Sequence, residues 1–189
     1  MPPCLFVTLN TNNVRYIQLI GFFLLHFAFK KEMKNLILFA SISVASGVLF
    51  VNIYNQFIDT RSWGSDVPNS IGAARSYFKV TNPGNFFRVF SPLNQILALV
   101  ALILFWKSPA NIRTFLIAAT ALYVIADVLT FAYFYPRNDI MFKNAPLSDT
   151  ELLKKTWSEW SAMNWVRTAI VFIGLIFSFA SLGRILSTK

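Results

Sequence analysis

The stretch ILALVALILFW, residues 96–106, contains only apolar side chains and decides the fold. It closes a longer apolar run, residues 86–106, and similar runs cover residues 35–57, 112–135 and 164–186. Each run is long enough to cross the roughly 30 Å hydrocarbon core of a bilayer as a helix. None alternates as a β-strand would, and a helix satisfies its own backbone hydrogen bonds in lipid. The sequence therefore predicts an all-α membrane protein, an antiparallel bundle of four transmembrane helices.

The composition agrees with this class of protein. Of the 189 residues, 56% are hydrophobic and only 13% are charged, whereas soluble domains carry about 25% charged residues. The net charge of +9 gathers at the ends of the apolar runs, where Lys and Arg meet anionic headgroups. The expected partner is therefore the lipid bilayer and not a nucleic acid. With one cysteine, Cys4, and one histidine, His26, no disulfide, metal site or cofactor site is expected.

The connections between the runs alternate in length. Residues 107–111 form a tight turn, whereas residues 58–85 and 136–163 form two long loops. A tight turn makes the second and third helices antiparallel neighbours, so the long loops lie together on the other side. Basic residues flank the tight turn and both ends of residues 34–189, which predicts that these ends are cytoplasmic. We therefore expect a multi-pass protein of the plasma (inner) membrane with both long loops outside.

Both long loops contain helix signals. In the first, a short amphipathic helix is expected to begin near Pro68. In the second, SDTE, residues 148–151, matches the capping-box pattern. No Pro or Gly follows it before Gly174. The fourth helix is therefore expected to begin near Asp149, outside the membrane, and to continue into it.

The beginning of the chain allows two interpretations. Residues 16–29 are apolar but short for a membrane span, and a basic cluster follows them. Residues 1–32 are therefore either an extension upstream of a start at Met33 or a short fifth helix. Residues 33–189 form the four-helix transmembrane domain in both interpretations.

Polar side chains lie inside the predicted spans, in the half that faces the long loops. From the helical rise, Asn94 and Asp127 lie about 12 Å deep, and Asn52 and Arg167 about 5–8 Å deep. The opposite half, which includes residues 96–106, has almost no polar residues. Because ionisable groups in spans are costly, they often mark functional sites. We predict a polar pocket open to the long loops, formed by Asp127, Arg167, Asn52, Arg88, Asn94, Trp160, Asn164 and Trp165.

The same residues also have structural explanations. Arg88 and Arg167 can extend to the headgroups while their stems stay in lipid. The tryptophans can form an ordinary interfacial belt. Asp127 and Arg167 can form a buried ion pair that fixes the register of two helices. The sequence leaves these explanations open beside the functional one.

Residues 157–168, WSEWSAMNWVRT, resemble the motif that opens the last helix of the anthrone oxygenase-like integral membrane proteins. The resemblance extends over residues 34–189. It implies a four-helix membrane protein and, in some members, a cofactor-independent oxygenase that converts anthrones to anthraquinones. Trp165 stands where many members have a histidine, which argues against that chemistry here. Weaker similarities occur in GVLFVNIYNQF (47–57), NPGNFFR (82–88) and RNDIMFKN (137–144).

Two classes of function follow. The first is a protein without catalysis that binds a small lipophilic molecule or a partner helix in the pocket. The alternative is an oxygenase acting on anthrone- or quinone-like aromatic substrates. There Asp127 would be the general base and Arg167 would hold an oxyanion. The substrate would be oriented and enclosed by Asn94, Asn164, Trp160 and Trp165. The oligomeric state does not follow from the sequence.

Overall fold

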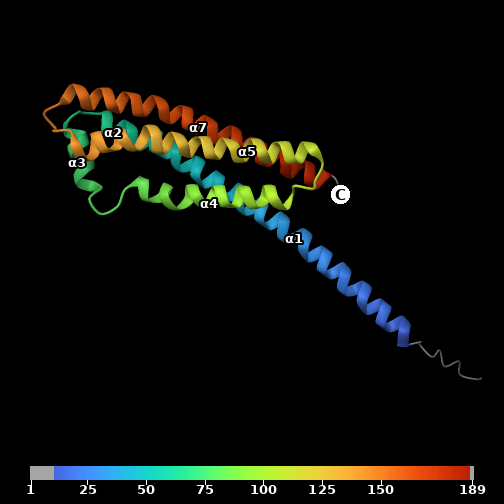
Figure 1. The fold of residues 1–189 in the computed structure, drawn as a ribbon. Helices are drawn as coiled ribbons and strands as arrows, with labels where there is room; N and C mark the ends of the chain where they lie inside the picture. Colours follow the sequence, from blue (N-terminus) through green and yellow to red (C-terminus); the bar gives the residue numbers. More distant parts are fainter. Residues whose placement is uncertain (1–10, 188–189) are drawn as a thin grey trace, which may run out of the picture. The chain divides into compact units, whose positions relative to one another are not determined.

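A computed structural model describes the backbone of residues 11–187 and the side chains of residues 32–187. Within these ranges the chain is helical and contains no strand, so the all-α prediction is confirmed. Three short π-helical segments, labelled η, interrupt the α-helices. The elements are α1 (Thr11–Tyr54), η1 (Asn55–Asp59), α2 (Thr60–Gly64), α3 (Asn69–Tyr77), α4 (Pro83–Leu104), α5 (Ala110–Leu129), η2 (Thr130–Phe134), α6 (Tyr135–Asp139), η3 (Ile140–Asn144) and α7 (Thr150–Ser187) (Figure 1).

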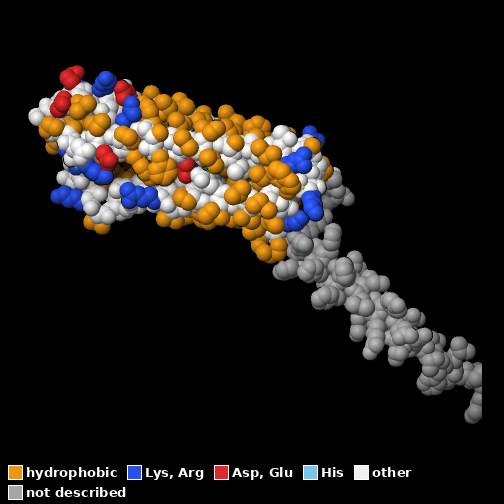
Figure 2. Space-filling model, in the orientation of Figure 1, with side chains coloured by type: hydrophobic (Ala, Val, Ile, Leu, Met, Phe, Trp, Pro, Cys, Tyr) orange, Lys and Arg blue, Asp and Glu red, His pale blue; other side chains and the backbone are white. Residues whose placement is uncertain are grey.

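Four helical stretches are long and apolar enough to cross a membrane: Glu32–Gly64, Pro83–Leu104, Ala110–Asn144 and Thr150–Ser187. The space-filling view shows a broad hydrophobic surface between two ends that carry most of the charged side chains, with an acidic side chain visible between them (Figure 2). A continuous apolar surface of this kind suits lipid and not water. The chain is a membrane protein, as the sequence predicted.

The beginning of the chain forms a unit of its own. Met1–Leu36 and Ile37–Lys189 are separate compact units. The backbone of α1 is helical through residues 16–29, and the interpretation of residues 1–32 as a short fifth helix stays a prediction. The assignment of residues 1–32 as an upstream extension also stays a prediction.

The two long loops are more helical than expected. The first helix continues through η1 and α2 to Gly64, and the third continues through η2, α6 and η3 to Asn144. Pro136, where the sequence predicts the end of the third helix, lies in the first turn of α6, directly after the π-helical segment η2. Only residues 65–68, 78–82 and 145–149 remain as irregular connections beside the tight turn.

Two predicted helix starts are confirmed, one with a different cap. The short helix near Pro68 is α3, and α7 runs without a break from Thr150 into the membrane span. The Asp149 carboxylate accepts a hydrogen bond from the backbone N–H of Leu152 at 3.2 Å. The capping residue is therefore Asp149 and not Ser148, which the capping-box pattern had indicated.

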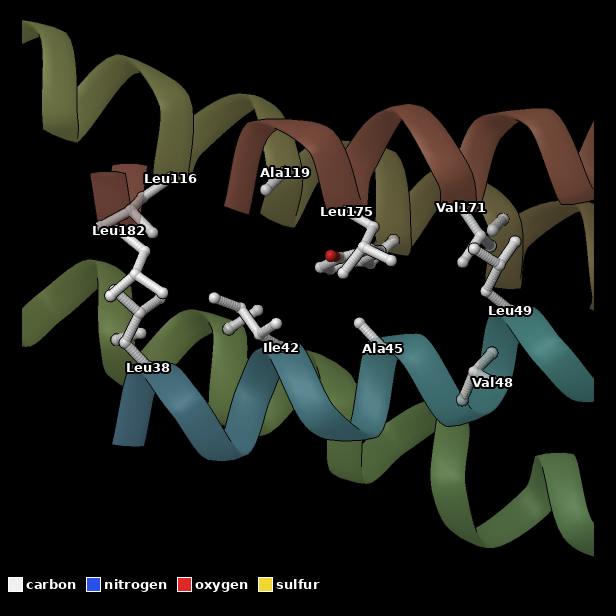
Figure 3. Packing of buried hydrophobic residues seen from close by; sticks show 14 of the residues in the cluster. Leu38, Ile42, Ala45, Val48, Leu49, Leu116, Ala119, Val171, Leu175 and Leu182 are labelled. Carbon is white, nitrogen blue, oxygen red and sulfur yellow. The ribbon is translucent and has the colours of Figure 1, made fainter. Parts of the chain in front are cut away.

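The long helices α1, α4, α5 and α7 share one hydrophobic core, which extends from Phe105 and Ile112 beside the tight turn to Phe87 near the start of α4. Residues of α1 face α5 and α7 across this core (Figure 3). It includes Leu38, Ile42, Ala45, Ala101, Leu116, Ala119, Leu175 and Leu182. A second, aromatic cluster lies at the loop ends and is built on Trp63, Phe134, Met141 and Trp160. Asn52, Asp127, Asn164 and Arg167 each lie between a residue of the first cluster and one of the second along the chain, whereas Arg88 and Asn94 lie between residues of the first cluster.

Candidate functional site

Arg167 is the centre of the polar region. It lies on α7 on the same face as Trp160 and Asn164, and only 4% of it is exposed. Its Nη2 donates to Asn164 Oδ1 at 2.7 Å, and its Nη1 donates to Thr130 Oγ1 at 3.3 Å. Its Cζ lies 3.9 Å from the centroid of the Phe134 ring. The cation is therefore held by neutral oxygens and an aromatic face.

Asn164 fixes the position of that guanidinium. It is fully buried, and its Nδ2 donates to Gln56 Oε1 at 2.8 Å and to the backbone O of Asn52 at 3.4 Å. Gln56 in turn donates to Ser161 Oγ at 3.1 Å. Because the amide nitrogen is bonded to the first helix, the amide oxygen is directed at Arg167. A hydrogen-bond network thus joins α1 and η1 to α7.

Asp127 lies on α5 and is held by α4. Gln95 Nε2 donates to its Oδ2, and Ser91, one turn earlier, adds a side-chain hydrogen bond. No side chain in residues 32–187 brings a carboxylate within 4.0 Å of Arg167. Asp127 and Arg167 therefore do not form the direct ion pair that was one explanation of the sequence, but they act on each other electrostatically and line one small cavity.

This inner cavity has a volume of about 20 Å³. Three of the residues that line it each carry a buried polar atom without a hydrogen-bond partner among the described residues: Asn52 Oδ1, Asn94 Oδ1 and Arg167 Nε. Its lining is Val48, Asn52, Phe87, Ser91, Asn94, Gln95, Tyr123, Ala126, Asp127, Thr130, Arg167 and Val171.

A larger, outer cavity of about 510 Å³ lies toward the loop ends of the helices. Phe87, Thr130 and Arg167 line both cavities. The aromatic residues on the outer cavity are Trp63, Phe78, Phe87, Phe134, Tyr135, Phe142 and Trp160. The basic ones are Arg75, Lys79, Arg88, Lys143 and Arg167, with Asp139 as the acidic one.

The aromatic walls are held by edge-to-face contacts. The ring centroids of Trp63 and Trp160 are 5.3 Å apart at 72°, and those of Phe134 and Trp160 are 5.3 Å apart at 83°. Trp160 Nε1 donates to Asn138 Oδ1 at 2.8 Å, which fixes the indole. Edge-to-face packing is a favourable aromatic geometry. The walls of the outer cavity are thus ordered by their own contacts.

The basic residues on the outer cavity differ in their availability. Arg75 donates to the backbone O of Met141 and of Ala145, both at 2.8 Å, and so caps the end of η3. Lys143 pairs with Asp139 at 2.6 Å. Arg167 is buried and has no carboxylate within 4.0 Å in the described part of the chain, although Asp127 acts on it electrostatically. Lys79 and Arg88 are exposed, so Arg167 is the buried basic side chain that a ligand inside the cavity would meet.

The structure brings together most of the predicted site residues. Asp127, Arg167, Asn52 and Asn94 line the inner cavity, and Arg88 and Trp160 line the outer one. Asn164 lines neither cavity but holds Arg167 from behind.

Trp165 is the exception among the predicted residues. It is 48% exposed and packs edge-to-face against Phe57, with centroids 5.6 Å apart. The prediction that Trp165 forms a pocket wall is wrong, because the face of α7 that bears Trp160, Asn164 and Arg167 does not include it.

Sequence reasoning missed several contributors, including Thr130, which accepts a hydrogen bond from Arg167. Gln56 lies four residues after Asn52, Gln95 directly follows Asn94, and Ser91 precedes Gln95 by one helical turn. Their i, i+3 and i+4 spacing was a usable signal. Phe134, which covers the guanidinium, had no such signal among so many phenylalanines. No group of three His, Cys, Asp or Glu side chains gathers in the searched part of the chain, so no metal centre is assigned there.

The fold and this site define a helical membrane protein with four candidate spans and a buried polar site beside an aromatic cavity. The family model of anthrone oxygenase matches residues 85–177, from the start of α4 to the second half of α7, and so includes Asp127 and Arg167. The resemblance inferred from residues 157–168 is thereby confirmed, and over the matched segment the chain is anthrone oxygenase-like. No curated protein and no solved structure matches the chain significantly.

Proposed function

We propose that this anthrone oxygenase-like membrane protein binds a small lipophilic aromatic molecule in the outer cavity, with an acidic oxygen of the molecule on Arg167. The observation that carries the proposal is the environment of Arg167. Its side chain is 4% exposed and lines both cavities. No carboxylate in the described part of the chain lies within 4.0 Å of it. A buried cation without an anionic partner destabilises a fold. A phenolate or enolate oxygen would supply that partner.

The outer cavity supports a planar aromatic ligand by size and walls. Its volume of about 510 Å³ lies within the roughly 300–1,000 Å³ of small-molecule sites. Trp63, Phe134 and Trp160 offer ring faces and edges to such a molecule. A partner helix, the other ligand considered, would dock along a groove of several helical turns. The lining residues instead gather at the loop ends of the helices, which favours a small molecule.

Binding is tested by titrating the protein in lipid nanodiscs with a hydroxyanthraquinone and following tryptophan fluorescence. Arg167→Gln should weaken binding by about tenfold or more, the effect of losing a charge-assisted hydrogen bond. Arg113→Gln is the matched control, because Arg113 lies over a tryptophan, Trp106, at 5.5 Å in the tight-turn region, away from both cavities. Equal affinities of the two folded variants would refute the proposal.

A second candidate function is a cofactor-independent oxygenase. The observation in its favour is that Asp127 lies on the inner cavity, which shares Arg167 with the outer one. Asp127 would take a proton from the methylene of an anthrone, and Arg167 would stabilise the oxyanion that forms. Dioxygen would accept the electrons, so that anthrone and O₂ give anthraquinone and water. Because residues 34–189 contain no histidine, Asp127 is the base that this site offers.

The oxygenase candidate is tested by the rate of O₂ consumption with an anthrone, corrected for the uncatalysed reaction. Asp127→Asn should abolish the enzyme-dependent rate while the hydroxyanthraquinone still binds. Unchanged O₂ consumption in this variant would exclude Asp127 as the base. If the unmodified protein shows no enzyme-dependent rate, the oxygenase candidate is refuted and only the binding function remains.

For the location, we propose a plasma (inner) membrane with the α2–α3 and α6–α7 connections outside. The proposal rests on the basic tight turn, where Lys107 and Arg113 lie. Ser65 and Ser148 are both exposed in these connections, so single cysteines can be placed there in a Cys4→Ser background. Both should react with an impermeant maleimide on intact cells. Labelling only after permeabilisation would reverse the orientation.

A further inference from the structure

We propose that the inner cavity is a binding site for one ordered water molecule that joins Asn52, Asn94 and Arg167 beside Asp127. The proposal concerns the protein without ligand and does not rest on the proposed function. It begins from the three polar atoms that have no hydrogen-bond partner among the described residues: Asn52 Oδ1, Asn94 Oδ1 and Arg167 Nε. All three belong to residues that line this cavity.

The burial of these groups makes a partner necessary. Asn52 is 1% exposed, Asn94 is 3% exposed and Arg167 is 4% exposed. A buried polar atom left unpaired destabilises the fold, and buried polar groups in native proteins are nearly always paired by protein or water. Three such atoms around one cavity point to one shared partner.

The chemistry of the three atoms matches a water molecule. Asn52 Oδ1 and Asn94 Oδ1 are acceptors, and Arg167 Nε is a donor. A water molecule can donate its two protons to the two amide oxygens and accept one hydrogen bond from the guanidinium. Buried waters make about three hydrogen bonds on average. A cation would fit the two amide oxygens and Asp127, but Arg167 would repel it.

The volume allows one water and little else. A cavity needs roughly 10–15 Å³ to hold one water, and the inner cavity has about 20 Å³. An aromatic ring therefore belongs in the outer cavity.

This water would explain how Asp127 and Arg167 share a cavity without an ion pair. Arg167 Nε would bond to the water, and the Asp127 carboxylate, held by Gln95, lines the same cavity. The water would lie beside both charged groups and provide a polar link between them. It would also place an exchangeable proton next to Asp127, on the side of the cavity that Arg167 shares with the outer cavity.

The direct test is an experimental structure of the full chain in lipid, at a resolution that shows waters. We expect one density peak in the inner cavity, within hydrogen-bond distance of Asn52 Oδ1, Asn94 Oδ1 and Arg167 Nε. A crystal grown in bromide separates water from an anion, because bromide gives an anomalous signal. No peak, or an anomalous peak, would overturn the proposal.

A second test uses the melting temperature of two apolar variants of similar volume, Asn52→Leu and Asn94→Leu. If both amides bind one water, replacing either amide releases that water. The fall in melting temperature of the double variant should therefore be smaller than the sum of the falls in the two single variants. The control pair is Asn94→Leu with Ser181→Ala, because Ser181 is fully buried but outside the cavity. For the control pair, the falls in melting temperature should add. If they also add for the two asparagines, the shared water is refuted.

Discussion

The two halves of the same four helices are held together by different interactions. Near the tight turn, the buried contacts are apolar, as between Leu38, Leu116 and Leu182. Toward the loop ends, Asn164 and Arg167 are buried instead and connect three helical segments by hydrogen bonds. The apolar half can be explained by packing alone. The polar half buries a cation, which is costly in a membrane span, and this cost is the reason that we place the candidate site there.

The halves also differ in how well their polar groups are paired. In the apolar half, Ser181 donates to the Ser178 carbonyl at 2.8 Å. Ser178 also bonds to Tyr123, which lines the inner cavity, at 3.0 Å. Among the described residues, the buried side-chain atoms without a partner belong to Asn52, Asn94 and Arg167, which all line the inner cavity. Polar side chains thus serve packing in one half and remain available for a ligand or water in the other.

The largest effect is expected for Asn164→Leu in the polar half. The variant removes the acceptor of Arg167 and the donor to Gln56. It should lower the free energy of unfolding by about 3–5 kcal/mol, because charged and neutral partners lose their hydrogen bonds together. Ser181→Ala, its counterpart in the apolar half, should cost about 0.6 kcal/mol. Both are measured by SDS-induced unfolding in mixed micelles, and equal losses would remove the distinction between the halves.

The next effect is expected for Gly64→Ala at the loop end. A Cβ on Gly64 would lie 2.1 Å from the Trp157 ring, whose Nε1 donates to the Thr60 carbonyl at 2.7 Å. The ring must shift, at a cost of about 1–3 kcal/mol. Gly47 has no atom within 4 Å of such a Cβ, so Gly47→Ala is the control and should be neutral or stabilising. A melting temperature unchanged in both variants would contradict this close packing.

A smaller effect is expected for Asp127→Asn. The residue is only partly buried, and Gln95 can still donate to the remaining amide oxygen. We expect a loss of about 1 kcal/mol in the same unfolding assay. A loss as large as that of Asn164→Leu would mean that Asp127 and Arg167 are bound directly to each other after all.

The smallest effect is expected for Trp165→Phe. Trp165 lies on the exposed side of α7 and packs against Phe57. Substitutions away from buried features usually change stability by less than about 0.5 kcal/mol. Ligand affinity should also stay the same, as measured by the fluorescence titration. A weaker affinity would return Trp165 to the binding site.

Much of the fold could be predicted because hydropathy and helix signals act locally. The apolar runs fall within the four candidate spans, and α7 begins one residue after Asp149 as expected. The π-helical segments could not be predicted, because each depends on one extra residue per turn that tertiary packing selects. They carry the third helix past Pro136, where a sequence pattern suggests an end.

The candidate site was predictable in depth but not in contacts. Counting along the helices placed Asp127 and Arg167 in the same half of the membrane, and both line one cavity. The depth of a residue along its helix does not show how the helix is rotated about its axis. A direct ion pair was therefore one explanation at a place where the two residues line a cavity instead. Trp165 shows the same limit, because its type suggested a pocket wall while its place on the helix turns it outward.

The most direct test of the central claim compares two tryptophans, one from each half. Trp160 lines the outer cavity, whereas Trp106 is 52% exposed beside the tight turn. A hydroxyanthraquinone should quench part of the tryptophan fluorescence in a saturable way. The amplitude of this quenching should be smaller in Trp160→Phe and unchanged in Trp106→Phe. The reverse result, or equal quenching of both variants, would contradict a binding site in the polar half.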